Sequence, residues 1–173
     1  MRTLVSLFIL VNATCVLNAT DYPVGAAPEA MSVADFDGKN GPDIATTAYE
    51  AANSSVLSLL LNDGTGRFSA PIITPISDAG TGALTAADLN TDGFADLVLG
   101  GNSIIVLLND GTGKFNAQSP ISIGSYAECL GVADLNSDGK PDVVATTTAG
   151  AVTFLGQGNG TFDAPVTSVG PRL

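Results

Sequence analysis

The chain repeats itself three times, and this repetition restricts the fold more than any other feature of the sequence. One recurring element ends each unit and reads LLNDGTGRFSAP from Leu60, LLNDGTGKFNAQSP from Leu107 and FLGQGNGTFDAP from Phe154. A second element precedes it in phase and reads ADFDGKNGPDIA from Ala34, ADLNTDGFADLV from Ala87 and ADLNSDGKPDVV from Ala133. The extra residues of the first unit fall in the polar stretch 48–55, where a loop tolerates insertion. The chain is therefore built from three copies of one structural unit.

Each unit is expected to fold into four short strands. In the middle unit these are residues 84–89, 96–100, 104–108 and 114–123, and the last is interrupted near Pro120. The apolar runs are short, β-branched residues are frequent, and Gly, Asn or Asp separate the runs. A repeated four-stranded unit of roughly 40–50 residues is typical of a β-propeller blade. We predict an all-β fold, a partial β-propeller of three four-stranded blades over about residues 26–77, 78–124 and 125–173.

The acidic residues gather in loops at the start of each unit. Of the 17 acids, which outnumber 6 bases, most are aspartates, and aspartate is both a turn former and a ligand for hard cations. The middle loop places oxygen-bearing residues at alternate positions, and the last loop repeats the spacing. The predicted ligands are Asp88, Asn90, Asp92, the carbonyl of Phe94 and Asp96, and then Asp134, Asn136, Asp138, the carbonyl of Lys140 and Asp142. Such an oxygen set suits Ca²⁺ better than Mg²⁺, which requires stricter octahedral geometry.

The first loop departs from this pattern. Asp35, Asp37 and Asp43 match the ligand positions, but Lys39 stands where the other loops have Asp92 and Asp138. We expect a weaker or vacant site there, with Lys39 as an internal counter-ion or with the chain shifted so that Asn40 supplies the oxygen. For all three loops the alternative is an acidic turn that holds no ion, but two copies with identical ligand spacing favour calcium, since clustered carboxylates repel one another without a cation.

These motifs resemble the FG-GAP/VCBS repeat family, the blade type of integrin α-subunit propellers and of many bacterial surface proteins. The resemblance rests on GRFSAP at Gly66, GTFDAP at Gly160 and the loops ADLNTDGFAD and ADLNSDGKPD, and it extends over about residues 21–173. It implies calcium in the loop between the first and second strands of each blade. Members of this family usually carry more blades, and three cannot close a ring. The chain is thus expected to be a fragment, an open arc or part of an oligomeric ring completed by self-association.

Residues 1–20 read as a secretory signal, with Arg2 followed by a short apolar run and small residues. The run is too short to cross a bilayer, and the alternative is that it forms a strand of the fold. We therefore expect a secreted, cell-surface or periplasmic protein with no membrane span. Cleavage would remove Cys15 and leave Cys129 unpaired, and we expect Cys129 to be a buried apolar residue.

The composition also narrows the function. The chain has no histidine, which removes the usual general base and every imidazole metal site, and no nucleophile–base pair is visible. A formal net charge of −11 with no basic patch argues against nucleic acid. We predict a non-enzymatic, calcium-binding module for protein or cell-surface binding and adhesion. The alternatives are a lectin-like propeller, for which Tyr22, Tyr49 and Tyr126 are the only polar-tipped aromatics, or an accessory domain of a secreted polysaccharide-active enzyme.

Overall fold

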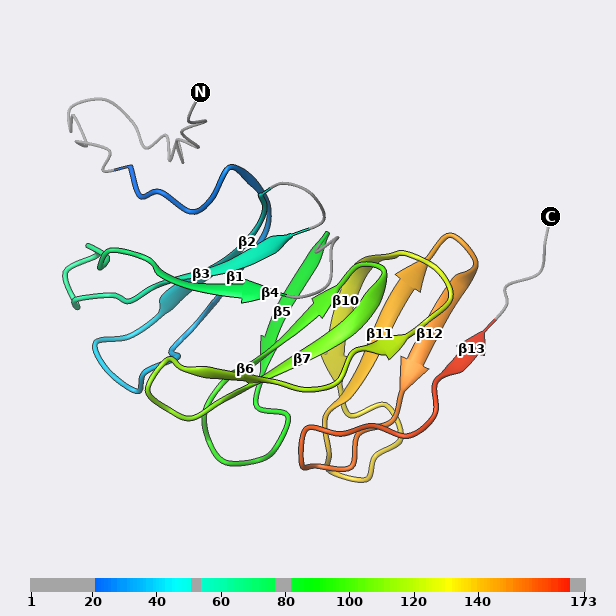
Figure 1. The fold of residues 1–173 in the computed structure, drawn as a ribbon. Coiled ribbons are helices and arrows are strands. Elements are labelled where there is room, and N and C mark those ends of the chain that lie inside the picture. The colour runs from blue at the N-terminus through cyan, green and yellow to red at the C-terminus, as the bar shows by residue number, and fades with distance from the viewer. Residues whose placement is uncertain (1–20, 51–53, 77–81, 169–173) are drawn as a thin grey trace, which may run out of the picture.

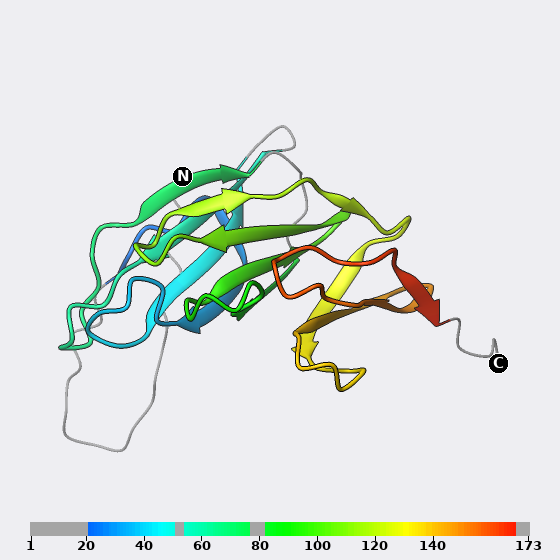
Figure 2. The same ribbon diagram turned by 90° about the horizontal axis from the view of Figure 1, so that it is seen from below.

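The computed structural model describes residues 21–50, 54–76 and 82–168, and within these ranges the fold contains strands and no helix. Figure 1 shows three antiparallel sheets arranged in chain order, with the middle sheet between the other two, and Figure 2 shows the same order from below. The prediction of an all-β chain with one sheet for each sequence repeat is therefore confirmed. The predicted signal at residues 1–20 lies outside the described residues.

The first and third sheets each contain four strands in sequential order. The first sheet consists of β1 (Ala27–Ala34), β2 (Asp43–Tyr49), β3 (Ser55–Leu60) and β4 (Ile72–Ile76). The third consists of β10 (Ala127–Ala133), β11 (Asp142–Thr147), β12 (Gly150–Phe154) and β13 (Val166–Ser168). Pro75 lies in β4, which is an edge strand, where proline is tolerated in a sheet.

The middle sheet contains five strands because its outer strand is divided. It consists of β5 (Ala83–Ala87), β6 (Asp96–Gly100), β7 (Ser103–Asn109), β8 (Phe115–Ala117) and β9 (Ile121–Ser122). Both β8 and β9 pair with β7, and Pro120 lies between them, where the sequence predicted the interruption. The other three strands of this unit also lie where they were predicted.

Two apolar layers hold the sheets together. The first lies between the first and second sheets and includes Phe36, Leu57, Leu59, Leu97, Leu99, Ile105 and Leu107. The second lies between the second and third sheets and includes Leu89, Val98, Val106, Val143, Val152 and Phe154. The first strands of the three sheets, β1, β5 and β10, also lie next to one another. The middle sheet is therefore covered on both faces, which explains why β6 is buried along its whole length.

The prediction that Cys129 is buried is wrong, because its side chain is exposed. Leu130, the next residue of β10, packs into the layer against the second sheet. Neighbouring side chains on a strand point to opposite faces, so Cys129 lies on the outer face of the third sheet, which no described residue covers.

Within the described residues, no helix is long and apolar enough to cross a membrane.

Candidate metal centres in three acidic loops

The predicted ligands lie in three equivalent loops. Loop 1 (residues 35–43) joins β1 to β2, loop 2 (residues 88–96) joins β5 to β6, and loop 3 (residues 134–142) joins β10 to β11. In each loop the ninth residue, an aspartate, is also the first residue of the second strand of its sheet. The loops are compared below by position, from one to nine.

The backbones of the three loops share the conformation of two positions and differ at a third, although their sequences differ more widely. The fourth and sixth residues of every loop have a positive φ. At the fourth position these are Gly38 (69°), Thr91 (61°) and Ser137 (63°), and at the sixth Asn40 (62°), Gly93 (91°) and Gly139 (81°). A positive φ is costly for most residues but accessible to glycine and asparagine. Loop 1 thus has glycine at the fourth position and asparagine at the sixth. It differs at the seventh position, where Gly41 has a φ of 91° while Phe94 and Lys140 do not have a positive φ.

The side chains at the first and third positions fold over the N–H group of the fifth residue. In loop 1 the N–H of Lys39 donates to Oδ1 of Asp35 at 3.2 Å and to Oδ1 of Asp37 at 2.9 Å. The N–H of Asp92 donates in the same way to Asp88 (3.1 Å) and Asn90 (3.0 Å) in loop 2, and that of Asp138 to Asp134 (3.1 Å) and Asn136 (2.9 Å) in loop 3. Loop 1 therefore keeps this part of the turn, and its chain differs from the other two loops at the seventh residue.

The ninth-position aspartates are completely buried and connect two segments of each sheet. In loop 2, Oδ2 of Asp96 accepts the N–H of Leu89 at 2.9 Å and Oδ1 accepts the N–H of Asn109 at 2.8 Å. The equivalent donors are Phe36 (2.8 Å) and Asn62 (2.8 Å) to Asp43, and Leu135 (2.8 Å) and Gly156 (2.7 Å) to Asp142. Each carboxylate therefore holds its loop to the hairpin that follows the third strand.

Burial raises the pKa of the Asp96 carboxyl above its usual range. The N–H groups of Asn109 and Leu89 oppose this shift, while the negative charges of Asp92 and Asp88 add to it. A nearby cation would favour the ionised form of Asp96 and offset the unfavourable burial of its charge.

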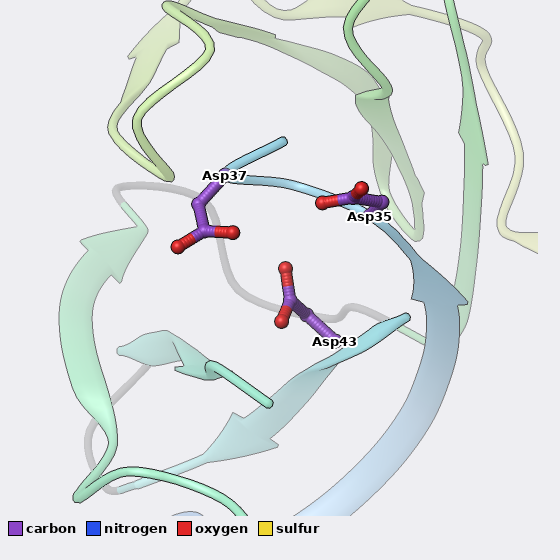
Figure 3. A group of neighbouring side chains, drawn as sticks. All are labelled: Asp35, Asp37 and Asp43. Atoms are coloured by element: carbon purple, nitrogen blue, oxygen red, sulfur yellow. The ribbon is translucent and has the colours of Figure 1, made fainter. Parts of the chain in front are cut away.

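Three carboxylates converge in loop 1. Figure 3 shows the side chains of Asp35, Asp37 and Asp43 directed toward one another, and one oxygen of each lies within 4.8 Å of the others. In the part of the chain that the structure describes, no other three acidic residues gather this closely. The donors are all hard oxygens in a loop with little steric restriction, so the set fits Ca²⁺. Loops 2 and 3 offer the same first, third and ninth positions, with an asparagine oxygen at the third.

The fifth position distinguishes the loops. Nζ of Lys39 lies 3.8 Å from Oδ2 of Asp37, with the lysine side chain 67% exposed and the aspartate 12% exposed. Asn40 lies against Gly64 of the hairpin. The structure therefore places the ammonium of Lys39 beside one carboxylate of loop 1, and whether the loop binds an ion stays a prediction.

In loops 2 and 3 the fifth residue is an aspartate, but the three carboxylates of each loop do not all lie within 4.8 Å of one another. Asp92 accepts the N–H of Phe94 at 2.9 Å and the side-chain amide of Asn90 at 2.8 Å. Asp138 accepts the N–H of Lys140 at 2.9 Å, and its Oδ2 also lies 3.3 Å from Nζ of Lys140. The side chains of the seventh residues lie against a hairpin glycine, Phe94 against Gly111 and Lys140 against Gly158, so only their carbonyl groups are candidates for a ligand role.

The hairpins beside the loops contain a further charged feature. Asp63 accepts both the hydroxyl (2.7 Å) and the N–H (2.8 Å) of Thr65, and Asp110 has the same arrangement with Thr112. These hydrogen bonds, led by the one from the threonine hydroxyl, hold the pKa of both exposed carboxyls below the usual range. The two aspartates stabilise tight turns and do not join the loop carboxylates.

Comparison with known proteins agrees with the repeat architecture. A sequence model described as an FG-GAP-like repeat matches residues 35–99 and again residues 92–145. The solved structure of a lectin from Agrocybe aegerita resembles this chain with a TM-score of 0.55 and 28% sequence identity. That lectin is described as specifically recognising non-reducing terminal N-acetylglucosamine. The similarity covers 78% of this chain but only 36% of the lectin chain. No curated protein sequence matches the chain.

Proposed function

The chain belongs to the FG-GAP-like repeat family, and from this membership we propose that it is a calcium-stabilised, non-catalytic binding module whose three sheets are blades of a β-propeller. The packing of three like sheets face to face in chain order supports the blade arrangement. The absence of histidine from the sequence supports a role in binding rather than catalysis.

Calcium is proposed to bind in all three loops through the first, third and ninth residues. These are Asp35, Asp37 and Asp43, then Asp88, Asn90 and Asp96, then Asp134, Asn136 and Asp142. Asp92 and Asp138, with the carbonyl groups of Phe94 and Lys140, complete the sets of loops 2 and 3, and Lys39 weakens the site in loop 1. The ion would balance the clustered negative charge and hold the loop against the strand that follows it.

A glycan is the ligand class that the comparisons favour. The lectin from Agrocybe aegerita shares more than the general fold, since over a quarter of the aligned residues are identical. Two aromatic side chains, Tyr126 (38% exposed) and Phe94 (36% exposed), are accessible on the middle and third units and could stack on a sugar ring. We propose carbohydrate recognition ahead of protein adhesion on this observation.

The sequence of residues 1–20 supports export from the cell, and calcium is abundant outside the cell. The proposal also includes association between copies of the chain, because strand β1 of the first sheet and loop 3 of the third carry exposed apolar residues, Met31 and Val33 in β1 and Leu135 in loop 3.

Glycan-array binding in calcium and in chelator tests the function. We expect selective binding to glycans that ends in chelator, and the same array probed with the Tyr126→Ser variant should lose signal while its melting temperature is unchanged. Binding to no glycan, with saturable binding to a purified cell-surface protein, would instead assign the adhesion role. Hydrolysis of any glycan on the array would contradict the non-catalytic role.

A further inference from the structure

The three sheets are joined by one recurring contact, in which a hairpin of each sheet covers the loop of the sheet before it. Hairpins 1, 2 and 3 are residues 62–68, 109–115 and 156–162. Phe36 of loop 1 is fully buried, and its ring centroid lies 5.7 Å from that of Phe115 in hairpin 2. Leu89 of loop 2 is 2% exposed and belongs to the same apolar layer as Phe162 of hairpin 3. The second residue of a loop is therefore buried by the next hairpin.

The same contact includes one hydrogen bond across each junction. The side-chain amide of Asn109 donates to the carbonyl oxygen of Phe36 at 2.8 Å. At the next junction the residue equivalent to Asn109 is a glycine, which has no side-chain amide. There the backbone N–H of Gly160, a later residue of hairpin 3, donates to the carbonyl oxygen of Leu89 at 3.1 Å.

Each junction also requires a glycine in the hairpin. A Cβ atom added to Gly113 would lie 3.0 Å from Cδ2 of Leu59 and 3.6 Å from Cδ2 of Leu61, both in the first unit. One added to Gly160 would lie 2.5 Å from Cδ2 of Leu108 in the second unit. Both hairpins thus lie directly on the preceding sheet, and a side chain at either glycine would displace a leucine of that sheet.

The third sheet presents one half of this contact without a described partner. Leu135 is equivalent to Phe36 and Leu89, yet its side chain is 50% exposed. Leu155, equivalent to Leu61 and Leu108, is half-buried, and no hairpin of the described residues lies against it.

Hairpin 1 presents the other half. A Cβ atom added to Gly66 would meet nothing within 4 Å, in contrast to Gly113 and Gly160. Asn62 donates to the carbonyl of Pro42 at 3.0 Å, as Asn109 does to that of Ala95, but among the described residues it has no equivalent of the second bond, from Asn109 to Phe36. Hairpin 1 has the same NDGTG sequence as hairpin 2.

Strand β1 extends this unmatched half. Met31 (50% exposed) and Val33 (55% exposed) are equivalent to Leu84 and Ala86 of β5, which pack against the first sheet. The centre of the same face carries Thr46 and Ser58, whose hydroxyls are buried and have no hydrogen-bond partner. Because these two side chains are already buried, a second copy cannot contact them. We therefore confine the contact surface to the rim formed by β1 and hairpin 1.

We propose that hairpin 1 and β1 of one copy dock on loop 3 and Leu155 of a second copy, repeating between chains the junction that joins sheets within the chain. Asn62 would donate to the carbonyl of Leu135, and Gly66 would lie on Leu155. Tyr22 of the same chain packs edge-to-face on Phe68, with ring centroids 5.8 Å apart, and its hydroxyl accepts the N–H of Phe68 at 3.0 Å. Phe68 is therefore already covered, and the docked contact within hairpin 1 is confined to Asn62, which is half-buried, and Gly66, which is exposed. The inference rests on the proposed association of like sheets and is independent of calcium or glycan binding.

Two variants block opposite ends of this head-to-tail contact. Gly66→Asn adds a side chain where only a docked copy would clash, and asparagine tolerates the φ of 83°. Leu135→Gln replaces an exposed apolar side chain, and its backbone N–H still reaches Asp142. Sedimentation of the full chain, with reductant to keep Cys129 from crosslinking, should show association from low micromolar to submillimolar concentrations. Each variant should weaken it about tenfold or more, at an unchanged melting temperature.

A mixture of the two variants provides the decisive result. Each retains one intact end, so the mixture should form a one-to-one heterodimer and nothing larger, whereas the parent chain extends further or closes a ring. A parent chain that stays monomeric at every concentration overturns the proposal, as does association that both variants retain. Loss of glycan binding or of calcium binding with association intact would contradict the proposed function and not this surface.

Discussion

Loops 1 and 2 share most of their turn but differ in the side chains at the candidate ligand positions. Both have positive φ values at the fourth and sixth positions, both fold two side chains over the fifth N–H, and both end in a buried aspartate. Loop 1 has Lys39 where loop 2 has Asp92, and Asp37 where loop 2 has Asn90. The turn over the fifth N–H and the ninth carboxylate are therefore common to both loops, while the residues at the third and fifth positions differ.

Removing the ninth carboxylate is expected to have the largest effect, and an equal effect in both loops. Asp43→Ala and Asp96→Ala each leave two buried N–H groups without an acceptor, which costs about 2–6 kcal/mol of the free energy of unfolding. Urea denaturation in chelator measures this loss without a contribution from calcium. Asp92→Ala, which is exposed, is the matched control and should cost about 1 kcal/mol or less. A large loss in loop 2 alone would show that the two loops are not built alike.

Calcium removal is expected to have the next largest effect. A site held at a hundred times its dissociation constant stabilises the fold by about 2.7 kcal/mol, and chelation removes that contribution. Scanning calorimetry should therefore give a lower melting temperature in chelator, and Mg²⁺ should not restore it. Asp88→Asn should remove more of this calcium-dependent stability than Asp35→Asn. Identical melting with and without chelator would exclude calcium as a structural ion.

Exchanging the fifth residues should convert one loop into the other. Lys39→Asp adds a carboxylate to loop 1 and is expected to tighten its calcium binding about tenfold, a change of about 1.4 kcal/mol. Asp92→Lys should weaken loop 2 to a similar extent. Calorimetric titration with Ca²⁺ measures both. Lys114→Asp, which makes the same change of charge in hairpin 2, should leave the affinities nearly unchanged; if it matches Lys39→Asp, the effect comes from net charge and not from ligation.

The smallest effect is expected from the hairpins beside the loops. The pKa values of Asp63 and Asp110 are lowered by hydrogen bonds from Thr65 and Thr112, so their stabilising contributions are present above the pKa of the unfolded chain and are lost as pH falls through the folded value. Hairpin 3 has Gln157 at this position and cannot titrate there. Asp63→Asn should reduce the difference in urea midpoint between about pH 6 and pH 3. An unchanged difference would show that the unfolded chain titrates identically.

The periodicity of the sequence was sufficient to predict the three sheets and the strands of the middle unit. The break in its outer strand was also predictable, because proline cannot donate to a sheet ladder. The positive φ values at Thr91 and Ser137 were not, since neither residue is typical of that conformation. Cys129 was misassigned because its exposure depends on whether another sheet follows the third, which the local pattern does not contain.

The candidate site was predicted as a set of oxygens but not as a structural connection. Asp43, Asp96 and Asp142 were assigned only as ligands, although all three also accept two backbone N–H groups. One signal was present: the ninth aspartate occurs in every repeat, including the loop that has Lys39. A residue that persists where the ligand set changes indicates a role in the fold itself.

The shared turn has a consequence for how such a chain responds to its surroundings. Because the turn over the fifth N–H is kept in all three loops although their third and fifth residues differ, a single substitution there is expected to alter the calcium affinity of one loop without disturbing the neighbouring sheets. Sheets whose loops have different calcium affinities would then bind their ions one after another as the calcium concentration of the medium rises. The array would stiffen in steps rather than all at once.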